Sequence, residues 1–443
     1  MVKRFFLMLK AEFAGYNGKK FSNDLMAGLT VAAVAIPLAL AFGVSSGADA
    51  AAGLITAILS GLVMSLLSGA SFQISGPTGA MTAILISLIA KNGIGAMFVA
   101  GFMAGVILLI AAFLKVGKVV SILPAPVIVG FTSGISIIIA LGQVDNFFGV
   151  TSVGENAIEK LLSYGELGFS PNWTAVIIGV LVILFMVFYP KKWGAVLPAS
   201  LVAIILATAA NMIFKFDVTV VGEIPKSLFG ENRLNVKDLA DFELLKGLVV
   251  PAISIAALAM IESLLCGASA SRMKGEKLDA DIELVSQGIG NIIIPFFGGV
   301  PSTAAIARTS VAIKSGLQTR LTGVIHAVVL LLAMFVIGPV MSKIPLSALA
   351  GVLMVTAFRM NEWEEIGHIF KKKFKSAAFL FFATMIATVV FDLTVAIVAG
   401  LVIAVIMFVI KISDIDLNYA TVDVDKLEDK GIKVQKSIIR LII

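Results

Sequence analysis

The chain has 443 residues, of which 59% are hydrophobic and 14% are charged, and its mean hydropathy is +1.04. Soluble domains carry about 25% charged residues, so this composition excludes a soluble globular protein and predicts an all-α polytopic membrane protein. The formal net charge of +6 does not indicate nucleic-acid binding, because basic residues of membrane proteins gather in cytoplasmic loops.

The chain divides into two apolar halves with polar segments before, between and after them. Residues 1–23 mix basic and apolar residues, which predicts an amphipathic lead-in on the cytoplasmic membrane face. Residues 24–214 and 247–412 are predicted to be two transmembrane repeats, joined by a polar extracellular connection over 215–246. Residues 413–443 are rich in acids and end in a strand-like run, so a cytoplasmic tail that opens a soluble domain is expected.

Apolar runs of membrane-spanning length mark most of the predicted segments. In the first half they lie at about 25–44, 51–67, 96–114, 126–141, 173–189 and 195–213. In the second half they lie at about 247–270, 282–297, 321–340, 346–358, 377–390 and 393–410. Residues 361–373 are amphipathic and basic, which predicts a helix along the membrane surface.

Two further segments are apolar but interrupted by Gly and Pro near their starts, at 72–90 and 298–316. The sequence Gly76-Pro77-Thr78-Gly79-Ala80 in the first echoes Val300-Pro301-Ser302-Thr303-Ala304 in the second. In the second, the apolar run from Thr303 to Ile313 is about half the 20 residues that cross a bilayer, and Pro301 suits a first helical turn. We therefore expect two half-helices that begin in mid-membrane, although each alone is compatible with an ordinary buried turn.

Matched breaks of this kind in two halves of a chain indicate a transporter site between inverted repeats. The free N–H groups and the dipole at each half-helix N-terminus favour an anion there. Thr78, Ser302 and Thr303 add hydroxyl donors at the two breaks.

Counted in chain order with the two half-helices included, the predicted spans number 14. Basic residues repeatedly follow the even-numbered ones, which places both termini in the cytoplasm by the positive-inside rule. These residues are Lys115, Lys118, Lys191, Lys192, Arg272, Lys274, Lys277, Lys314, Arg320, Arg359, Lys371, Lys372, Lys373 and Lys375.

Two ionisable residues inside predicted spans are candidates for function, because burying a charge in the membrane is costly. Glu262 is interpreted as a proton or cation relay beside the anion site, the alternative being a purely structural hydrogen-bonding role. Arg308 adds positive charge behind the second half-helix terminus, pairs with Glu262, or lines a cytoplasmic vestibule; the sequence leaves these alternatives open.

Other chemistry finds no support in the sequence. His326 and His368 are isolated, so no metal site is predicted, and the single Cys266 excludes an internal disulfide. No phosphate-binding loop, serine elbow or metalloprotease pattern occurs, so neither an enzyme nor a bound cofactor is expected. Transport should then be passive or driven by an ion gradient, with a proton or Na⁺ as the coupling ion.

The chain resembles the membrane domain of the SulP family of anion transporters over roughly residues 24–412. The motifs that carry this resemblance are Asp24-Leu-Met-Ala-Gly-Leu-Thr-Val, Ala35-Ile-Pro-Leu-Ala-Leu-Ala-Phe-Gly, Ile74-Ser-Gly-Pro-Thr-Gly, Gly130-Phe-Thr-Ser-Gly-Ile, Glu262-Ser-Leu-Leu-Cys, Gln287-Gly-Ile-Gly-Asn and Gly298-Gly-Val-Pro-Ser-Thr-Ala-Ala-Ile-Ala-Arg-Thr.

The resemblance implies about 14 segments in two inverted repeats of seven, as in uracil-permease-like transporters. It further implies a core domain with the site, a gate domain, a homodimer, and a C-terminal STAS domain of which this chain holds only the start. By position, it places substrate-binding residues at Leu38, Phe42, Thr78, Gly79, Ala80, Ser302, Thr303, Ala304 and Ala305, beside Arg308.

One departure bears on the substrate. Many sulfate-type members carry Gln after the Pro of the first span, where this chain has Leu38. The motifs are more similar to those of bacterial members that move four-carbon dicarboxylates with protons or bicarbonate with sodium.

Together, the patterns predict a secondary active transporter of small anions (sulfate, dicarboxylate or bicarbonate) in the cytoplasmic membrane, working by elevator-type alternating access and coupled to protons or sodium. The alternatives are an uncoupled anion channel or facilitator on the same fold, and a nucleobase permease. An intramembrane enzyme is disfavoured because no nucleophile–base constellation is present.

Overall fold

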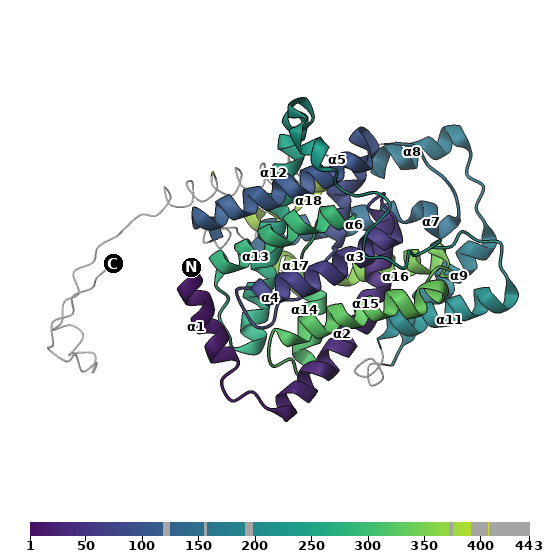
Figure 1. The fold of residues 1–443 in the computed structure, drawn as a ribbon. Coiled ribbons are helices and arrows are strands. Elements are labelled where there is room, and N and C mark those ends of the chain that lie inside the picture. The colour runs from purple at the N-terminus through teal and green to yellow at the C-terminus, as the bar shows by residue number, and fades with distance from the viewer. Residues whose placement is uncertain (118–124, 155–156, 191–197, 372–374, 391–405, 407–443) are drawn as a thin grey trace, which may run out of the picture.

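The computed structural model describes residues 1–117, 125–154, 157–190, 198–371, 375–390 and 406. Helices make up most of this structure, as the composition predicts (Figure 1). The elements of the first half are α1 (Val2–Glu12), α2 (Gly18–Ser45), α3 (Ala50–Leu59), η1 (Ser60–Met64), α4 (Ser65–Leu67), β1 (Ser75–Gly76), α5 (Gly79–Phe113), α6 (Ala125–Gly142), α7 (Val144–Phe148), α8 (Ala157–Leu167), α9 (Trp173–Phe188) and α11 (Ala199–Phe214).

The second half repeats this succession of long helices around a second short strand. Its elements are η3 (Val236–Ala240), α12 (Phe242–Lys274), α13 (Ala280–Ile293), η4 (Ile294–Phe297), β2 (Thr303–Ala304), α14 (Ile306–Lys314), α15 (Leu321–Met341), α16 (Leu346–Met360), α17 (Trp363–Lys371) and α18 (Lys375–Val390). The predicted span at 393–410 and the tail at 413–443 lie outside the described residues, apart from residue 406.

Six described helical stretches are long and apolar enough to cross a membrane: Gly18–Ser45, Ala50–Leu67, Gly79–Phe113, Ala125–Phe148, Phe242–Lys274 and Leu321–Met341. Shorter apolar helices cover four further predicted spans, at Trp173–Phe188, Ala199–Phe214, Leu346–Met360 and Ala377–Val390. The predicted span at 282–297 falls on α13 and η4, which are not among these apolar helices. The continuous stretch α5 contains two predicted spans, because Gly93 has a left-handed φ of 81° that interrupts the helix between them.

Two helices begin earlier than their apolar runs indicated. α2 begins at Gly18 rather than near residue 25, because the Asn17 side chain accepts a hydrogen bond from the Lys20 N–H and caps the helix. In the same way, Asp241 accepts from the N–H groups of Glu243 and Leu244, so α12 begins at Phe242 rather than at residue 247. Hydropathy did not indicate either start, because the first turn of each helix contains charged residues.

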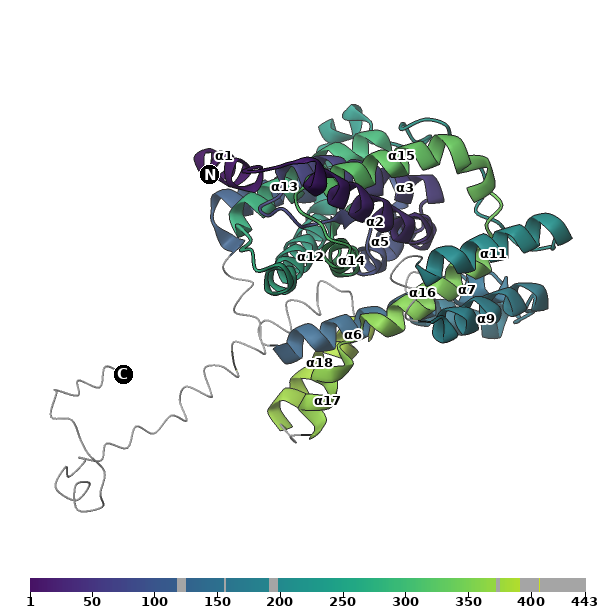
Figure 2. The ribbon, with the colours of Figure 1, turned by 90° about the horizontal axis from the view of Figure 1, so that it is seen from below.

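The helices form two groups that lie beside each other (Figure 2). The site group contains α2, α3, α5, α12, α13, α14 and α15, in which α5 packs against α12 and α13, and α2 packs against α3 and α15. The flanking group contains α6, α7, α9, α11, α16 and α18, in which α6 packs against α18 and α16 packs against α9. Each group draws helices from both halves of the chain, as expected for intertwined inverted repeats.

The two short strands join the halves at the centre of the site group. β1 and β2 pair antiparallel, with Ser75 opposite Ala304 and Gly76 opposite Thr303. Each buried strand leads into a helix start, that of α5 after β1 and that of α14 after β2. The register of this small sheet therefore fixes how the two helix starts lie relative to each other.

Candidate functional site

The first half-helix start is built around Thr78. Its Oγ1 accepts a hydrogen bond from the Met81 N–H at 3.3 Å, which caps α5. The same hydroxyl donates to Oε2 of Glu262 on α12 at 2.8 Å. Thr78 is buried and Glu262 is partly exposed. The structure thus brings together the N-terminus of α5 and the intramembrane acid that the sequence singled out.

The second half-helix starts later than predicted. The sequence predicts a half-helix that opens at about Pro301, but α14 begins at Ile306, and Thr303 and Ala304 are extended in β2. The prediction was wrong because the pairing with β1 satisfies this backbone, and the Ala305 N–H donates to the Ile74 carbonyl at 3.0 Å. The start of α14 has no side-chain cap, and Ala305 and Ile306 are partly exposed and exposed, respectively.

Ser302 and Thr303 face protein. The Asn291 side chain forms two hydrogen bonds with the Ser302 backbone, accepting from its N–H at 2.8 Å and donating to its carbonyl at 2.9 Å. The Ser302 hydroxyl contacts the sulfur of Met64 at 3.3 Å, and the Thr303 hydroxyl shares a hydrogen bond with Ser263 at 2.8 Å. In this conformation the two hydroxyls hold the second break in place.

Arg308 lies in the first turn of α14. Its side chain is 1% exposed, and Nη2 donates to the carbonyl of Pro77 at 2.8 Å, which ties α14 to the first break. Nη1 has no hydrogen-bond partner, and among the described residues no carboxylate forms an ion pair with Arg308. Of the alternatives in the sequence analysis, the geometry matches a buried positive charge behind the two breaks, not a pair with Glu262.

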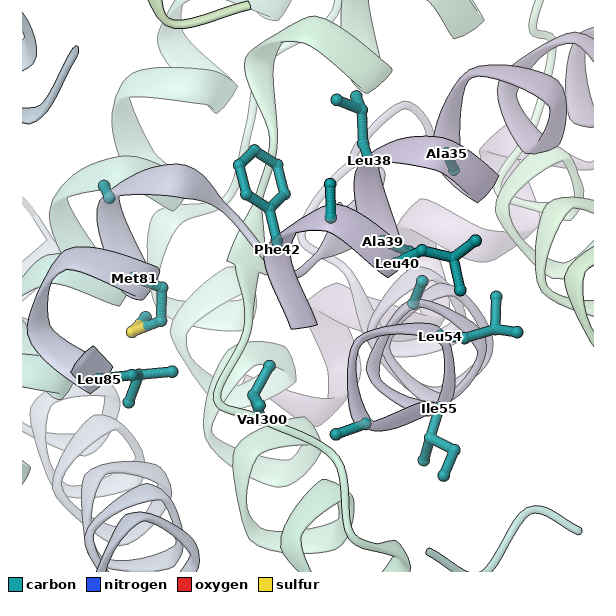
Figure 3. Packing of buried hydrophobic residues seen from close by; sticks show 14 of the residues in the cluster. Ala35, Leu38, Ala39, Leu40, Phe42, Leu54, Ile55, Met81, Leu85 and Val300 are labelled. Atoms are coloured by element: carbon teal, nitrogen blue, oxygen red, sulfur yellow. The ribbon is translucent and has the colours of Figure 1, made fainter. Parts of the chain in front are cut away.

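Apolar side chains of α2 lie beside the first half-helix start. Leu38 and Phe42 lie one helical turn apart on α2 and point to the same side, away from Leu54 and Ile55 of α3 (Figure 3). A Cβ placed on Gly79 would lie 3.2 Å from the Phe42 ring and 2.2 Å from Cδ1 of Ile139 on α6. The first residue of α5 therefore contacts both α2 and the flanking group. Ala80, the next residue, is fully buried.

A buried polar network holds the chain that enters the first break. Glu283 is fully buried and accepts from the Ser68 hydroxyl at 2.7 Å, the Gly69 N–H at 3.0 Å and the Gln287 amide at 2.7 Å. Gln287 also donates to the Ser75 hydroxyl of β1 at 2.9 Å. Glu283 lies in the first turn of α13, where an acid also suits the helix dipole. The motif that contains Gln287 and Asn291 was visible in the sequence, but their supporting roles were not.

Two cavities lie away from this site. One of about 340 Å³ is lined by residues that include Asp145, Asn172 and Ser347, and another of about 430 Å³ by residues that include Ser133, Phe358 and Phe381. Within the described residues, no group of three or more His, Cys, Asp or Glu side chains is arranged to hold a metal ion.

Inverted repeats with two interrupted segments define a class of membrane transporters. In this class a half-helix follows each interruption, and the substrate site lies between the two half-helix N-termini. The chain belongs to the Sulfate permease family, whose family model matches residues 21–384.

Its relatives by sequence include a putative sulfate transporter, YvdB, of Bacillus subtilis, which is 37% identical over 92% of this chain and 77% of the relative. The bicarbonate transporter BicA of a Picosynechococcus species is 32% identical over 90% of this chain and 72% of the relative.

Solved structures agree with this membership. The transmembrane domain of a cyanobacterial bicarbonate transporter, BicA, matches with a TM-score of 0.78 and 30% identity, covering 88% of this chain and 98% of that domain. The structure of SLC26A9 shares the fold, with a TM-score of 0.80 and 18% identity over 93% of this chain and 69% of that protein.

Proposed function

We propose that this protein is a secondary active transporter of a small anion of the bicarbonate, sulfate or dicarboxylate class, coupled to protons or Na⁺ through Glu262. The anion is bound between the starts of α5 and α14, against Leu38 and Phe42. The observation that carries the proposal is the hydrogen bond from Thr78 to Glu262, because it places an acid at the helix terminus where the anion would bind.

The coupling follows from electrostatics. Two like charges about 4 Å apart repel by about 4 kcal/mol at an effective dielectric constant of about 20. An anion beside Glu262 is therefore bound well only when a proton or a cation neutralises the carboxylate. Arg308 supplies fixed positive charge from behind the breaks and favours an anion over a neutral nucleobase. Anion and coupling ion then move together.

The wider arrangement supports alternating access. We infer that the site group moves against the flanking group as in an elevator, with the contact between Gly79 and Ile139 at their boundary. We further propose that the protein is a homodimer in the cytoplasmic membrane, with both termini in the cytoplasm. The basic residues that follow the even-numbered spans support a cytoplasmic N-terminus.

The test is uptake of radiolabelled bicarbonate, sulfate and fumarate into proteoliposomes, with and without a proton or Na⁺ gradient. Glu262→Gln keeps an oxygen that accepts from Thr78 but cannot carry a charge. We expect it to retain exchange of the anion while losing gradient-driven accumulation. Glu231→Gln, an exposed acid in the polar connection, is the matched control and should behave as wild type.

Full gradient-driven accumulation by the Glu262→Gln protein would contradict the coupling role. A wild-type flux that ignores both gradients would instead identify an uncoupled channel or facilitator.

A further inference from the structure

The N-terminal helix α1 lies across the ends of helices of the site group rather than along them (Figure 1). Two ionic contacts fasten its inner side. Arg4 forms ion pairs with Asp279 at 2.9 Å and Asp281 at 3.3 Å, at the start of α13. At the other end, buried Glu12 forms an ion pair with buried Arg320 at 2.8 Å, just before α15. We call these two contacts the α1 clamp.

The clamp reaches the first break. Nη1 of Arg320 donates to the carbonyls of Leu66 at 2.8 Å and Ser68 at 3.3 Å. These residues lead into the segment that ends in β1. The position of α1 is thereby tied to the part of the chain that supports the anion site.

Within the part of the chain that the structure describes, the outer face of α1 is uncovered. Phe6 is 63% exposed and Leu7 is 59% exposed, and Lys3 and Lys10 are exposed on the same helical stripe. The acids beside α1 are engaged in the clamp on the inner side, so the outer face presents apolar and cationic side chains together.

Further exposed apolar side chains follow α1 in the chain. Phe21, Met26 and Leu29, at the start of the first membrane span, are all exposed apolar side chains. A surface helix with apolar side chains and lysines adjoining a membrane span has the composition of an interfacial amphipathic helix, whose lysines are attracted to anionic headgroups.

We propose that the outer face of α1 docks on anionic phospholipid headgroups, with Phe6 and Leu7 at the acyl boundary and Lys3 and Lys10 on the phosphates. In the orientation proposed above, this is the cytoplasmic leaflet. Through the clamp, the docked helix holds the entry to the first break at a fixed depth relative to the bilayer. The docking itself does not depend on which anion is transported or on its coupling.

The test places an environment-sensitive dye on Leu7→Cys, because Cys266 is buried and unreactive by position. The protein is reconstituted, one copy per nanodisc, in phosphatidylcholine alone or with phosphatidylglycerol added. We expect a blue shift of the dye emission, and quenching by a lipid-borne quencher, that are much larger with phosphatidylglycerol. Adding Lys3→Gln and Lys10→Gln should remove that difference.

The matched control replaces Lys226 and Lys237, two exposed lysines of the polar connection, with Gln and should leave the difference intact. Thermal unfolding of each variant verifies that the clamp and fold persist. Equal emission in both lipids, whether shifted or unshifted, would overturn the proposal. A shift that follows the number of protein copies per disc instead of lipid charge would assign the face to a second copy, and would overturn it too.

Discussion

Thr78 uses one hydroxyl for two purposes. The hydroxyl oxygen accepts from the Met81 N–H and caps α5, while the hydroxyl proton goes to Glu262. A change in the charge of Glu262 therefore alters the strength of a bond made by the capping residue itself, since hydrogen bonds to charged acceptors are roughly twice as strong as neutral ones. The charge of Glu262 and the capping of α5 are therefore linked through the hydroxyl oxygen of Thr78.

Arg308 illustrates a different use of charge at the residue scale. Replacing it with Gln removes the buried cation and weakens the bond to Pro77. We expect the KM for anion uptake to rise by about tenfold, equivalent to about 1.4 kcal/mol, and the protein to lose about 2 kcal/mol of stability, typical of a hydrogen bond from a charged group. Uptake kinetics and thermal unfolding measure the two effects.

Lys314→Gln is the control for Arg308, because it removes a charge from the exposed end of the same helix. It should change neither quantity appreciably. A folded Arg308→Gln protein with the KM of wild type would show that the buried guanidinium acts only as a structural tie.

At the scale of elements, the two strands pair the buried backbone that leads into both half-helix starts. Their backbone groups would otherwise lack partners in a setting where an unpaired buried polar group costs several kcal/mol. β1 and β2 supply partners to each other, and Asn291 completes the set at Ser302. The short sheet thus has the same function for these breaks that capping side chains have for ordinary helices.

Gly76 sits where the sheet and Arg308 meet. A Cβ at this position would lie 1.5 Å from Nη1 of Arg308, a fully buried side chain with little room to move. We expect Gly76→Ala to destabilise the protein by about 3 kcal/mol, the upper part of the usual range for overpacking, and to abolish uptake. Thermal unfolding and proteoliposome flux report these effects.

Gly95→Ala provides the comparison, since nothing lies within 4 Å of a Cβ at Gly95. This substitution should leave stability and flux near wild type. Wild-type stability for Gly76→Ala would mean that the sheet and Arg308 are less closely packed than the structure has them.

For the whole molecule, the contact between Gly79 and Ile139 matters because it joins the moving parts proposed above. A disulfide between Gly79→Cys and Ile139→Cys would fasten the start of α5 to α6. We expect the oxidised double variant to lose nearly all uptake, and dithiothreitol to restore it. Flux before and after reduction, with the extent of cross-linking followed by mass spectrometry, checks this.

The two single-cysteine variants control for oxidation elsewhere, as Cys266 is buried. Undiminished uptake in a fully cross-linked protein would rule out relative motion of the two groups at this point.

Much of the architecture was predictable from the sequence, because crossing a bilayer requires apolar runs of fixed length. The helix α9, for example, runs from Trp173 to Phe188 where hydropathy predicted 173–189, and Asn172 caps it. The two interrupted segments were found for the same reason, since Gly and Pro inside apolar runs are visible without a structure. Glu262 and Arg308 stood out because charges are rare in such surroundings.

Only the tertiary structure decided how the breaks are built. No local signal makes Thr303 and Ala304 extended; they are so because Ser75 and Gly76 offer backbone partners and Asn291 holds Ser302. Nor does the sequence reveal that Arg308 bonds to Pro77 while Glu262 bonds to Thr78. The thickness of the membrane determines where the apolar runs lie along the chain. Capping side chains then set helix starts such as those of α2 and α12, and hydrogen bonds between residues far apart in sequence determine which polar groups meet.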